Sequence, residues 1–203
     1  MAAPDPTPRL PAAERRRQLL DVALAAFSAG GFHGTSMDDV AAAAGVTKPV
    51  LYQHFGSKRA LYLELLDDVG GQLMDVIAKA AAGADGPSRQ VEAGFRAYFR
   101  FVDHREPSFR LLFGGGSKRD EGFAERVRLV EDAIAELIAS FITARLPAAQ
   151  TLTLAQGIVG MAESSCRYWL RQRAAGATTA TADELADQLA ELAWAGLRGV
   201  GPR

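Results

Sequence analysis

The sequence predicts an all-α fold. Alternating runs of β-branched residues are absent, alanine, leucine, arginine and glutamate dominate, and apolar residues recur at intervals of three and four. The chain has 203 residues, of which 48% are hydrophobic and 23% are charged. Both values are close to the globular average, so we expect an ordered protein of one domain or two small domains with a buried core.

Charge, cysteine content and hydropathy exclude several classes of protein. The net charge of −1 excludes a chain that coats nucleic acid over its whole surface but allows a local basic patch. The lone Cys166 can form neither an internal disulfide nor a cysteine-based zinc site. No stretch approaches the ~18 apolar residues of a membrane span, so we expect a soluble cytoplasmic protein without membrane contact. The three histidines are far apart in the sequence, and no metal or cofactor is expected.

The N-terminal segment and the first helix are separated by proline. Residues 1–11 hold four prolines and no apolar core, so they are predicted to form a disordered arm and not a signal peptide. The first helix is expected to begin at Pro11 and to end at Gly30-Gly31, because glycine adopts the left-handed C-cap conformation at little cost. Its apolar face is formed by residues spaced four apart: Leu19, Ala23 and Phe27.

The second helix is predicted to begin at Ser36. Asp39 follows three residues later, in the place that glutamate takes in a capping box. Gly45 is expected to break this short helix. Its inward face is predicted to consist of small apolar residues: Val40, Ala41 and Ala44.

The third helix is predicted to follow directly. Thr47 is a good N-cap, and Pro49 stands where a missing N–H costs nothing. Leu51 and Phe55 are four residues apart and are expected to point inward. The helix should end near Gly56.

The remaining helices are longer. Ser57 is expected to cap a fourth helix, whose apolar period continues for about five turns to residue 82. Gly70-Gly71 is expected to be a weak point or bend within it. Five further helices are predicted over residues 88–104, 107–113, 121–145, 151–173 and 182–198. These lengths and loops are typical of a helical bundle.

The second and third helices have the layout of a helix-turn-helix. They meet at Gly45, and the small side chains of Ala41 and Ala44 allow them to cross closely. On the outward face, Lys48 can reach guanine or a phosphate, and Gln53 can pair with adenine. The residues expected to contact DNA are Thr47, Lys48, Pro49, Tyr52, Gln53, His54 and, at the start of the fourth helix, Lys58.

The string from Gly45 to Lys58, GVTKPVLYQHFGSK, closely resembles the recognition segment of TetR-family transcriptional regulators. Ala26-Phe27, Gly31-Phe32 and Thr35-Ser36-Met37 also match that family in spacing, and the resemblance covers about residues 12 to 75. It implies a nine-helix homodimer whose three N-terminal helices bind a double-stranded DNA operator. The six C-terminal helices would bind a small-molecule effector and dimerise.

The resemblance also implies domain boundaries and a mode of action. A helix-turn-helix DNA-binding domain is expected over residues 12–72, and an effector-binding and dimerisation domain over residues 73–203. Most family members are repressors that ligand releases from DNA, so we expect such a repressor, bound as a dimer to a palindromic operator. One position departs from the family pattern: Met37-Asp38-Asp39 stands where an arginine is often found. The backbone N–H groups of Ser36 and Met37 are expected to hold a phosphate there.

Aromatic side chains crowd the segment from Phe95 to Phe113. This pattern fits either a plain core or a core that encloses a cavity. Glu163 and Arg167 are four residues apart and form either a surface ion pair or a pair that orients ligand. We expect a mostly hydrophobic effector, for which Glu163 would favour a cation and Arg167 an anion. The predicted ligand-binding residues are Phe95, Phe99, Val102, Phe109, Phe113, Glu163, Ser164, Arg167 and Tyr168.

The last two helices carry apolar faces that predict a homodimer. Two such helices from each chain can form a four-helix interface with two-fold symmetry. Leu192 and Trp194 lie about 200° apart on one helix, so one of them is expected to face the core of its own subunit. The two faces consist of Leu152, Ile158, Val159 and Met161, and of Leu185, Leu189, Leu192, Trp194 and Leu197.

Two other functions compete with DNA binding. A helical enzyme would need a nucleophile, a base or a metal grouping, and the sequence shows none. An all-α interaction module would use the helix-turn-helix for packing alone. The prediction is therefore a ligand-responsive DNA-binding regulator that is not an enzyme.

Overall fold

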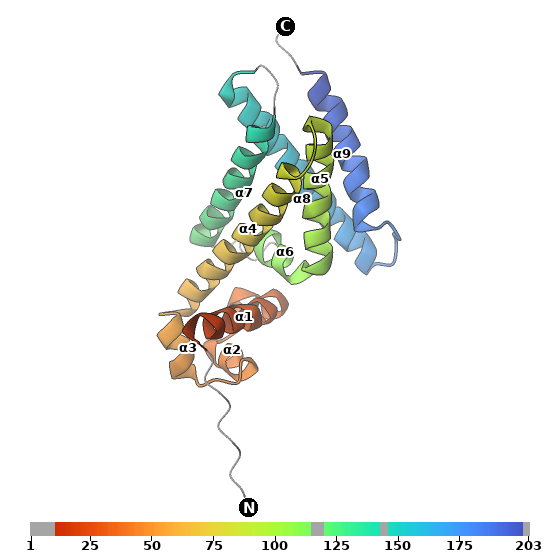
Figure 1. Cartoon of the computed structure of the whole chain (residues 1–203). Helices are drawn as coiled ribbons and strands as arrows, with labels where there is room; N and C mark the ends of the chain where they lie inside the picture. Colours follow the sequence, from red (N-terminus) through yellow and green to blue (C-terminus); the bar gives the residue numbers. More distant parts are fainter. Residues whose placement is uncertain (1–10, 115–119, 143–145, 201–203) are drawn as a thin grey trace, which may run out of the picture. The chain divides into compact units, whose positions relative to one another are not determined.

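The computed structural model describes residues 11–114, 120–142 and 146–200, and within them it confirms the all-α prediction. These ranges contain nine helices and no strand (Figure 1). The helices are α1 (Ala12–Gly34), α2 (Met37–Ala43), α3 (Lys48–His54), α4 (Lys58–Ala82), α5 (Pro87–His104), α6 (Glu106–Phe113), α7 (Glu121–Phe141), α8 (Ala148–Ala174) and α9 (Ala182–Arg198). Apart from Pro11, the arm expected over residues 1–11 lies outside the described residues. The end predicted for α7 at residue 145 is wrong, because α7 ends at Phe141 and Ile142 is extended.

The chain divides into two compact units, residues 1–65 and 66–203. In the first unit, the apolar face of α1 is buried as predicted. The expected end of α1 at Gly30-Gly31 is wrong: Gly31 has φ +69° and kinks the helix, which then continues to Gly34. Glycine adopts this left-handed conformation without strain, so the chain bends and resumes its helical path. Phe32, beyond the kink, packs edge-to-face against Tyr62 of α4.

The predicted capping box of α2 is present. The Ser36 hydroxyl accepts a hydrogen bond from the Asp39 backbone N–H at 3.1 Å, and the Asp39 carboxylate accepts one from the Ser36 N–H at 2.8 Å. Thr47 occupies the N-cap position of α3, but its side chain makes no capping hydrogen bond. Ser57 caps α4 as expected, since its hydroxyl accepts from the Ala60 N–H at 3.0 Å.

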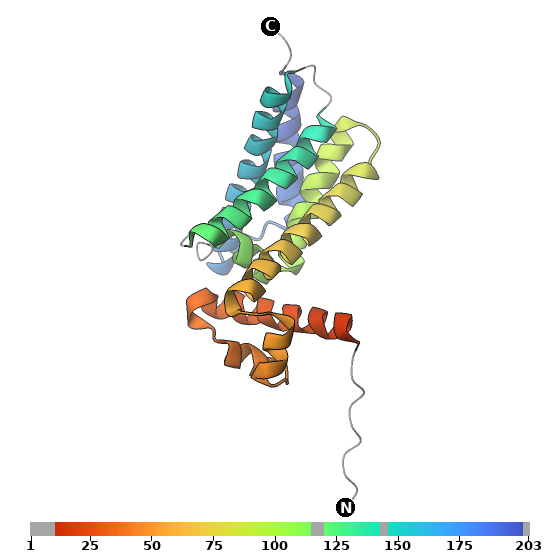
Figure 2. The same cartoon turned by 90° about the vertical axis from the view of Figure 1, so that its left-hand side faces the viewer.

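In the second unit, the most extensive helix contacts pair α5 with α9 and α7 with α8. Both views of the chain show α5 against α9 (Figures 1 and 2). The buried face of α9 is made of small residues, which allow close approach: Ala182, Ala186, Ala190 and Ala193. Arg96 contacts Asp187 at 2.8 Å and Arg100 contacts Asp183 at 2.6 Å, so α5 and α9 run antiparallel.

Gly70 determines how closely α7 approaches α4. A Cβ atom at Gly70 would lie 2.6 Å from Cγ2 of Val130, whereas one at Gly71 would meet nothing within 4 Å. The helix runs through both glycines from Lys58 to Ala82. The feature predicted as a weak point therefore has a packing role at Gly70, because only a residue without a side chain fits beneath Val130.

Candidate nucleic-acid interface and internal cavity

The helix-turn-helix of the first unit forms as the sequence predicts. Ala41 and Ala44 are buried where α2 meets α3. Gly45 has φ +65°, and the Val46 N–H donates to the Ala41 carbonyl at 3.0 Å, which closes the turn. The turn therefore requires a residue that tolerates the left-handed region, and glycine does so without strain.

The third helix is anchored on one side and exposed on the other. Leu51 and Phe55 are buried, as predicted. The five predicted DNA-contact residues Thr47, Lys48, Pro49, Tyr52 and Gln53 are exposed, and His54 is half-buried. One face of α3 thus presents a cation, a phenol and an amide to solvent, which are groups that hydrogen-bond base edges and phosphates in a major groove.

Lys48 is paired within the first unit. Its Nζ lies 2.7 Å from the Asp38 carboxylate, so α3 is tied to the first turn of α2. The hydrogen bond and charge of Asp38 raise the pKa of Lys48, which keeps the ammonium protonated. Any phosphate or base that binds Lys48 must compete with this carboxylate.

Three predicted phosphate contacts differ in their availability. The Ser36 backbone N–H already donates to the Asp39 carboxylate at 2.8 Å, so a phosphate at this position would have to compete with the capping box. The Met37 side chain is buried, which leaves its backbone N–H at the first position of α2. The Lys58 ammonium lies 4.4 Å from the centre of the Phe32 ring and is half-buried.

Arg16 holds the C-terminal end of α3, a role that sequence reasoning missed. Its Nε donates to Glu64 at 2.8 Å, and Nη1 donates to the His54 carbonyl at 2.6 Å. The guanidinium also lies 4.5 Å from the centre of the Phe55 ring. These contacts join α1, α3 and α4 within the first unit. No sequence signal pairs Arg16 with a residue 48 positions away.

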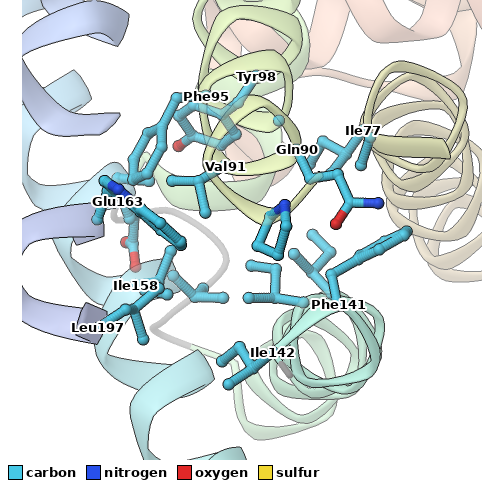
Figure 3. A pocket seen from close by; sticks show the side chains of 18 of the residues that line it. Ile77, Gln90, Val91, Phe95, Tyr98, Phe141, Ile142, Ile158, Glu163 and Leu197 are labelled. Carbon is cyan, nitrogen blue, oxygen red and sulfur yellow. The ribbon is translucent and has the colours of Figure 1, made fainter. Parts of the chain in front are cut away.

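The second unit contains a cavity of about 260 Å³ that is partly open to solvent. Side chains of α4, α5, α7, α8 and α9, together with Phe113 of α6, line it (Figure 3). Most of them are aliphatic or aromatic, including Ile77, Ile134 and Ile158. Five lining residues carry polar groups: Gln90, Tyr98, Glu163, Trp194 and Arg198.

Both parts of the chain match models of one family. Residues 19–65 match "Bacterial regulatory proteins, tetR family", and residues 87–196, more than half of the chain, match "Tetracyclin repressor-like, C-terminal domain". The chain is also 32% identical over 194 residues to the "HTH-type transcriptional activator FasR" of Mycolicibacterium smegmatis, covering 95% of this chain and 87% of that protein. The chain belongs to the TetR family. It is a DNA-binding transcriptional regulator of that family.

Solved structures of TetR-family proteins share the fold along nearly the whole chain. A TetR-like regulator of Rhodococcus sp. RHA1 is 31% identical, with a TM-score of 0.75, and covers 95% of this chain and 100% of that one. A TetR-family regulator of Streptomyces coelicolor is 29% identical, with a TM-score of 0.74, and covers 93% and 82%. FadR of Bacillus subtilis, solved in complex with stearoyl-CoA, is 13% identical, with a TM-score of 0.75, and covers 89% and 98%; its likeness is one of fold.

The cavity of this TetR-family chain brings together only part of the predicted ligand set. Phe95, Phe113 and Glu163 line it. Phe99, Val102 and Phe109 are buried but do not line it, and Ser164 and Tyr168 are exposed, contrary to expectation. The helical period explains α8: successive residues differ by about 100°, so when position 163 faces the cavity, positions 164 and 168 face away.

Arg167 also stands off the cavity wall. It forms an ion pair with Glu163 and donates to the Phe113 carbonyl at 3.1 Å. The predicted ligand-binding set lacks Trp194 and the α7 residues that line the cavity. Three of those α7 residues, Ile134, Ile138 and Phe141, recur at helical spacing. Their period was the available signal, but it does not distinguish a cavity wall from ordinary core.

Tyr98 and Cys166 are buried beside each other. Burial is the main reason that the pKa of the Tyr98 phenol is raised and that of the Cys166 thiol reaches about 12, so both stay protonated. Cys166 is therefore the buried small apolar residue that the sequence predicts. Among the described residues, the Tyr98 hydroxyl has no hydrogen-bond partner. The neighbouring Cys166 thiol does not replace one, because a thiol is only a weak donor and acceptor.

Within residues 11–114, 120–142 and 146–200, the structure shows neither a membrane-spanning helix nor a cluster of metal ligands. No helix among these residues is long and apolar enough to cross a membrane. In the same ranges, no three His, Cys, Asp or Glu side chains gather in a way that would hold a metal ion.

Proposed function

We propose that this TetR-family regulator is a homodimeric repressor that a small apolar ligand releases from a palindromic operator. The observation that carries DNA recognition is the two-sided third helix: Leu51 and Phe55 anchor it while Lys48, Tyr52 and Gln53 are exposed together. The protein would act in the cytoplasm, where DNA is accessible, and by binding alone, without catalysis. Its DNA-binding domain would span residues 12–72 and its effector domain residues 73–203.

The exposed face of α3 supports a division of roles among its side chains. We propose that Lys48 and Gln53 read bases and that Tyr52 binds a phosphate. Thr47, Pro49 and His54 would border the same groove. Lys58 and the Met37 N–H would hold the backbone on either side.

A dimer would place two copies of α3 in successive major grooves, about 34–36 Å apart. The dimer interface is proposed to lie on α8 and α9. Leu192 is 61% exposed on α9 and Leu152 is 38% exposed on α8, so both leave apolar surface for a partner chain. Trp194 lines the cavity, which agrees with the opposite directions predicted for these two α9 residues.

Footprinting on genomic fragments would identify the operator, and affinity for that DNA would test the interface. Lys48→Ala and Tyr52→Ala are each expected to weaken binding about tenfold, because each removes a base or phosphate contact. Leu129→Ala, an exposed position on α7, is the control that should bind normally. Unchanged affinity in both α3 variants, with folding intact, would refute DNA binding through this helix.

The cavity supports the proposal of a ligand-responsive protein. A ligand shifts the protein away from DNA only if it binds the non-DNA-binding conformation better. Ile138 of α7 is half-buried and lines the cavity, so Ile138→Phe should reduce the response to an effector while DNA affinity stays normal. Leu129→Phe, at an exposed position of the same helix, is the matched control. A reporter gene downstream of the operator would distinguish a repressor from an activator.

A further inference from the structure

The polar groups of the cavity lie at two levels of its α5–α9 wall. Arg96 pairs with Asp187 and Arg100 with Asp183, and this antiparallel register brings the start of α5, with Gln90, toward the end of α9, with Arg198. Tyr98 lies two turns further along α5 than Gln90, about 12 Å at 1.5 Å per residue. Tyr98 and Glu163 lie near Phe95 and form one polar position, called here the inner position, and Figure 3 shows Gln90 apart from it. Arg198 lies toward the Gln90 end of the α5–α9 wall.

The Tyr98 hydroxyl is the unsatisfied group of the inner position. Tyr98 is 7% exposed, and its hydroxyl oxygen is buried without a hydrogen-bond partner among the residues that the structure describes. A buried polar group left in this state costs free energy, which a ligand recovers if it supplies the missing partner. The other residues that line the cavity are mostly apolar, so they provide little else to orient a ligand at this level.

Glu163 sets the charge at the inner position. The Glu163 side chain is 12% exposed and lines the cavity, whereas its partner Arg167 is 36% exposed and does not line it. The cavity-facing member of the pair is thus negative, which disfavours an anion there. Because Arg167 already neutralises Glu163, a buried cation would have no net counter-charge, so a neutral group is favoured over either ion.

The volume limits the size of the part of the ligand that lies inside the cavity. An apolar cavity of about 150 Å³ accommodates one benzene ring. In proportion, the 260 Å³ of this cavity accommodates about ten non-hydrogen atoms. The ligand body must be apolar, because the aliphatic walls offer no hydrogen bonds.

We propose that the inner position binds a neutral hydroxyl group carried by an apolar molecule of about ten non-hydrogen atoms. The ligand hydroxyl would accept a hydrogen bond from the Tyr98 O–H and donate one to the Glu163 carboxylate. This inference rests on the proposed use of the cavity as the effector site, and it names the ligand class. A carboxylate ligand would be kept from the inner position and confined to the Arg198 level.

The test uses 1-nonanol and nonanoate as probes of the full-length protein in the absence of DNA. Binding is measured by calorimetry and by the fluorescence of Trp194, which lines the cavity, whereas Trp169 is buried elsewhere and bonded to the Ala180 carbonyl. Tyr98→Phe removes only the hydroxyl. This variant should lower the affinity for 1-nonanol about tenfold and leave the affinity for nonanoate unchanged. Tyr168→Phe, which removes an exposed phenol hydroxyl from α8, should change neither affinity.

A second measurement keeps the test independent of ligand affinity. The unliganded Tyr98→Phe protein should melt at or above the temperature of the parent protein, because the variant loses an unpartnered buried hydroxyl. A lower melting temperature would show that the hydroxyl has an internal partner and would overturn the proposal. Glu163→Gln should raise nonanoate affinity, since it removes the cavity-facing charge.

The outcomes separate this inference from the proposed function. Equal 1-nonanol affinity in Tyr98→Phe and the parent, or nonanoate binding that depends on Tyr98, would overturn the hydroxyl site while leaving the cavity as an effector site. If neither 1-nonanol nor nonanoate bound the parent protein, the hydroxyl site would also be overturned. DNA binding by α3, measured separately with Lys48→Ala, is unaffected by any of these results.

Discussion

The ammonium of Lys48 and the carboxylate of Asp38 lie 2.7 Å apart, joining the exposed face of α3 to the first turn of α2. The cation that we propose reads DNA is therefore held by an anion of the same unit, and DNA would have to replace that anion. Both side chains are well exposed, so water screens the pair and the exchange is inexpensive. Asp38 stands in the segment where the family often has arginine, and it would oppose DNA binding both by pairing with Lys48 and by its own negative charge.

Asp38→Asn is expected to strengthen DNA binding roughly threefold or more, because Lys48 no longer exchanges partners and a negative charge near the phosphates is lost. A plot of the logarithm of affinity against the logarithm of salt concentration should also become steeper, with a slope that changes by up to about one. Fluorescence anisotropy over a salt series measures both effects. Asp75→Asn, which breaks the exposed Asp75–Lys79 pair in the second unit, has the same net charge and should leave both unchanged. Weaker binding by Asp38→Asn would contradict the competition.

Arg16→Gln is expected to lower DNA affinity several-fold, because α3 loses the hydrogen bond at the His54 carbonyl and the contact over Phe55. Since Arg16 would act by positioning α3 and not by touching phosphate, the salt dependence should stay the same. The neighbouring Arg15 is exposed and bonds to Gln18, so Arg15→Gln removes the same charge as a control. A reduced salt slope in Arg16→Gln alone would instead identify Arg16 as a phosphate contact.

Substitutions at the two adjacent glycines of α4 should have opposite effects. Gly70→Ala is expected to lower the free energy of unfolding by about 1–3 kcal/mol, because the new methyl group collides with Val130, whose branched side chain has few rotamers in a helix. In Gly71→Ala the new methyl group has no atom within 4 Å, so the higher helix propensity of alanine should raise the free energy of unfolding by about 0.5–1 kcal/mol. Denaturant unfolding compares the two. Adding Val130→Ala should restore the stability of the Gly70→Ala protein. Equal effects of alanine at both glycines would disprove the close approach of α7 to α4 at Gly70.

The capping box of α2 predicts a dependence of stability on pH. Hydrogen bonds from the Ser36 backbone N–H and hydroxyl hold the pKa of Asp39 below its ordinary value of 3.8. A carboxylate whose pKa is lower in the folded state adds stability above its unfolded pKa and loses it as the pH falls through the folded pKa. The parent protein should therefore be more stable than Asp39→Asn near neutral pH, and this difference should shrink below about pH 3.8. A difference that is constant across that range would rule out the ionised cap.

Dimer formation can be tested at Leu192. Leu192→Glu should convert a dimer of about 43 kDa, twice the 21.6 kDa chain, into monomers, because a charge would be buried in the interface. Leu129→Glu places the same charge on the exposed surface of α7 and should remain dimeric. Light scattering at micromolar concentration measures the mass. A monomeric parent protein, or a Leu192→Glu dimer, would refute the proposed interface.

Local chemistry made much of the helical framework predictable. Ser36, Gly45 and Ser57 occupy the cap and turn positions expected of them, because caps and left-handed turns depend on residues within one helical turn. Helical periodicity likewise identified Leu51 and Phe55 as the buried side of α3. Fold class and family followed from such short-range patterns, and the last helix has the predicted bounds, Ala182–Arg198.

Only the tertiary structure decided which of these residues meet. Arg16 with Glu64 and Gly70 with Val130 are contacts between helices distant in the sequence, and no periodicity encodes them. The cavity is the clearest case. An aromatic residue is buried equally well in a packed core and in a cavity wall, so the sequence could not separate Phe99 from Phe95. Their difference arises from where neighbouring helices leave space, and that is a property of packing in three dimensions.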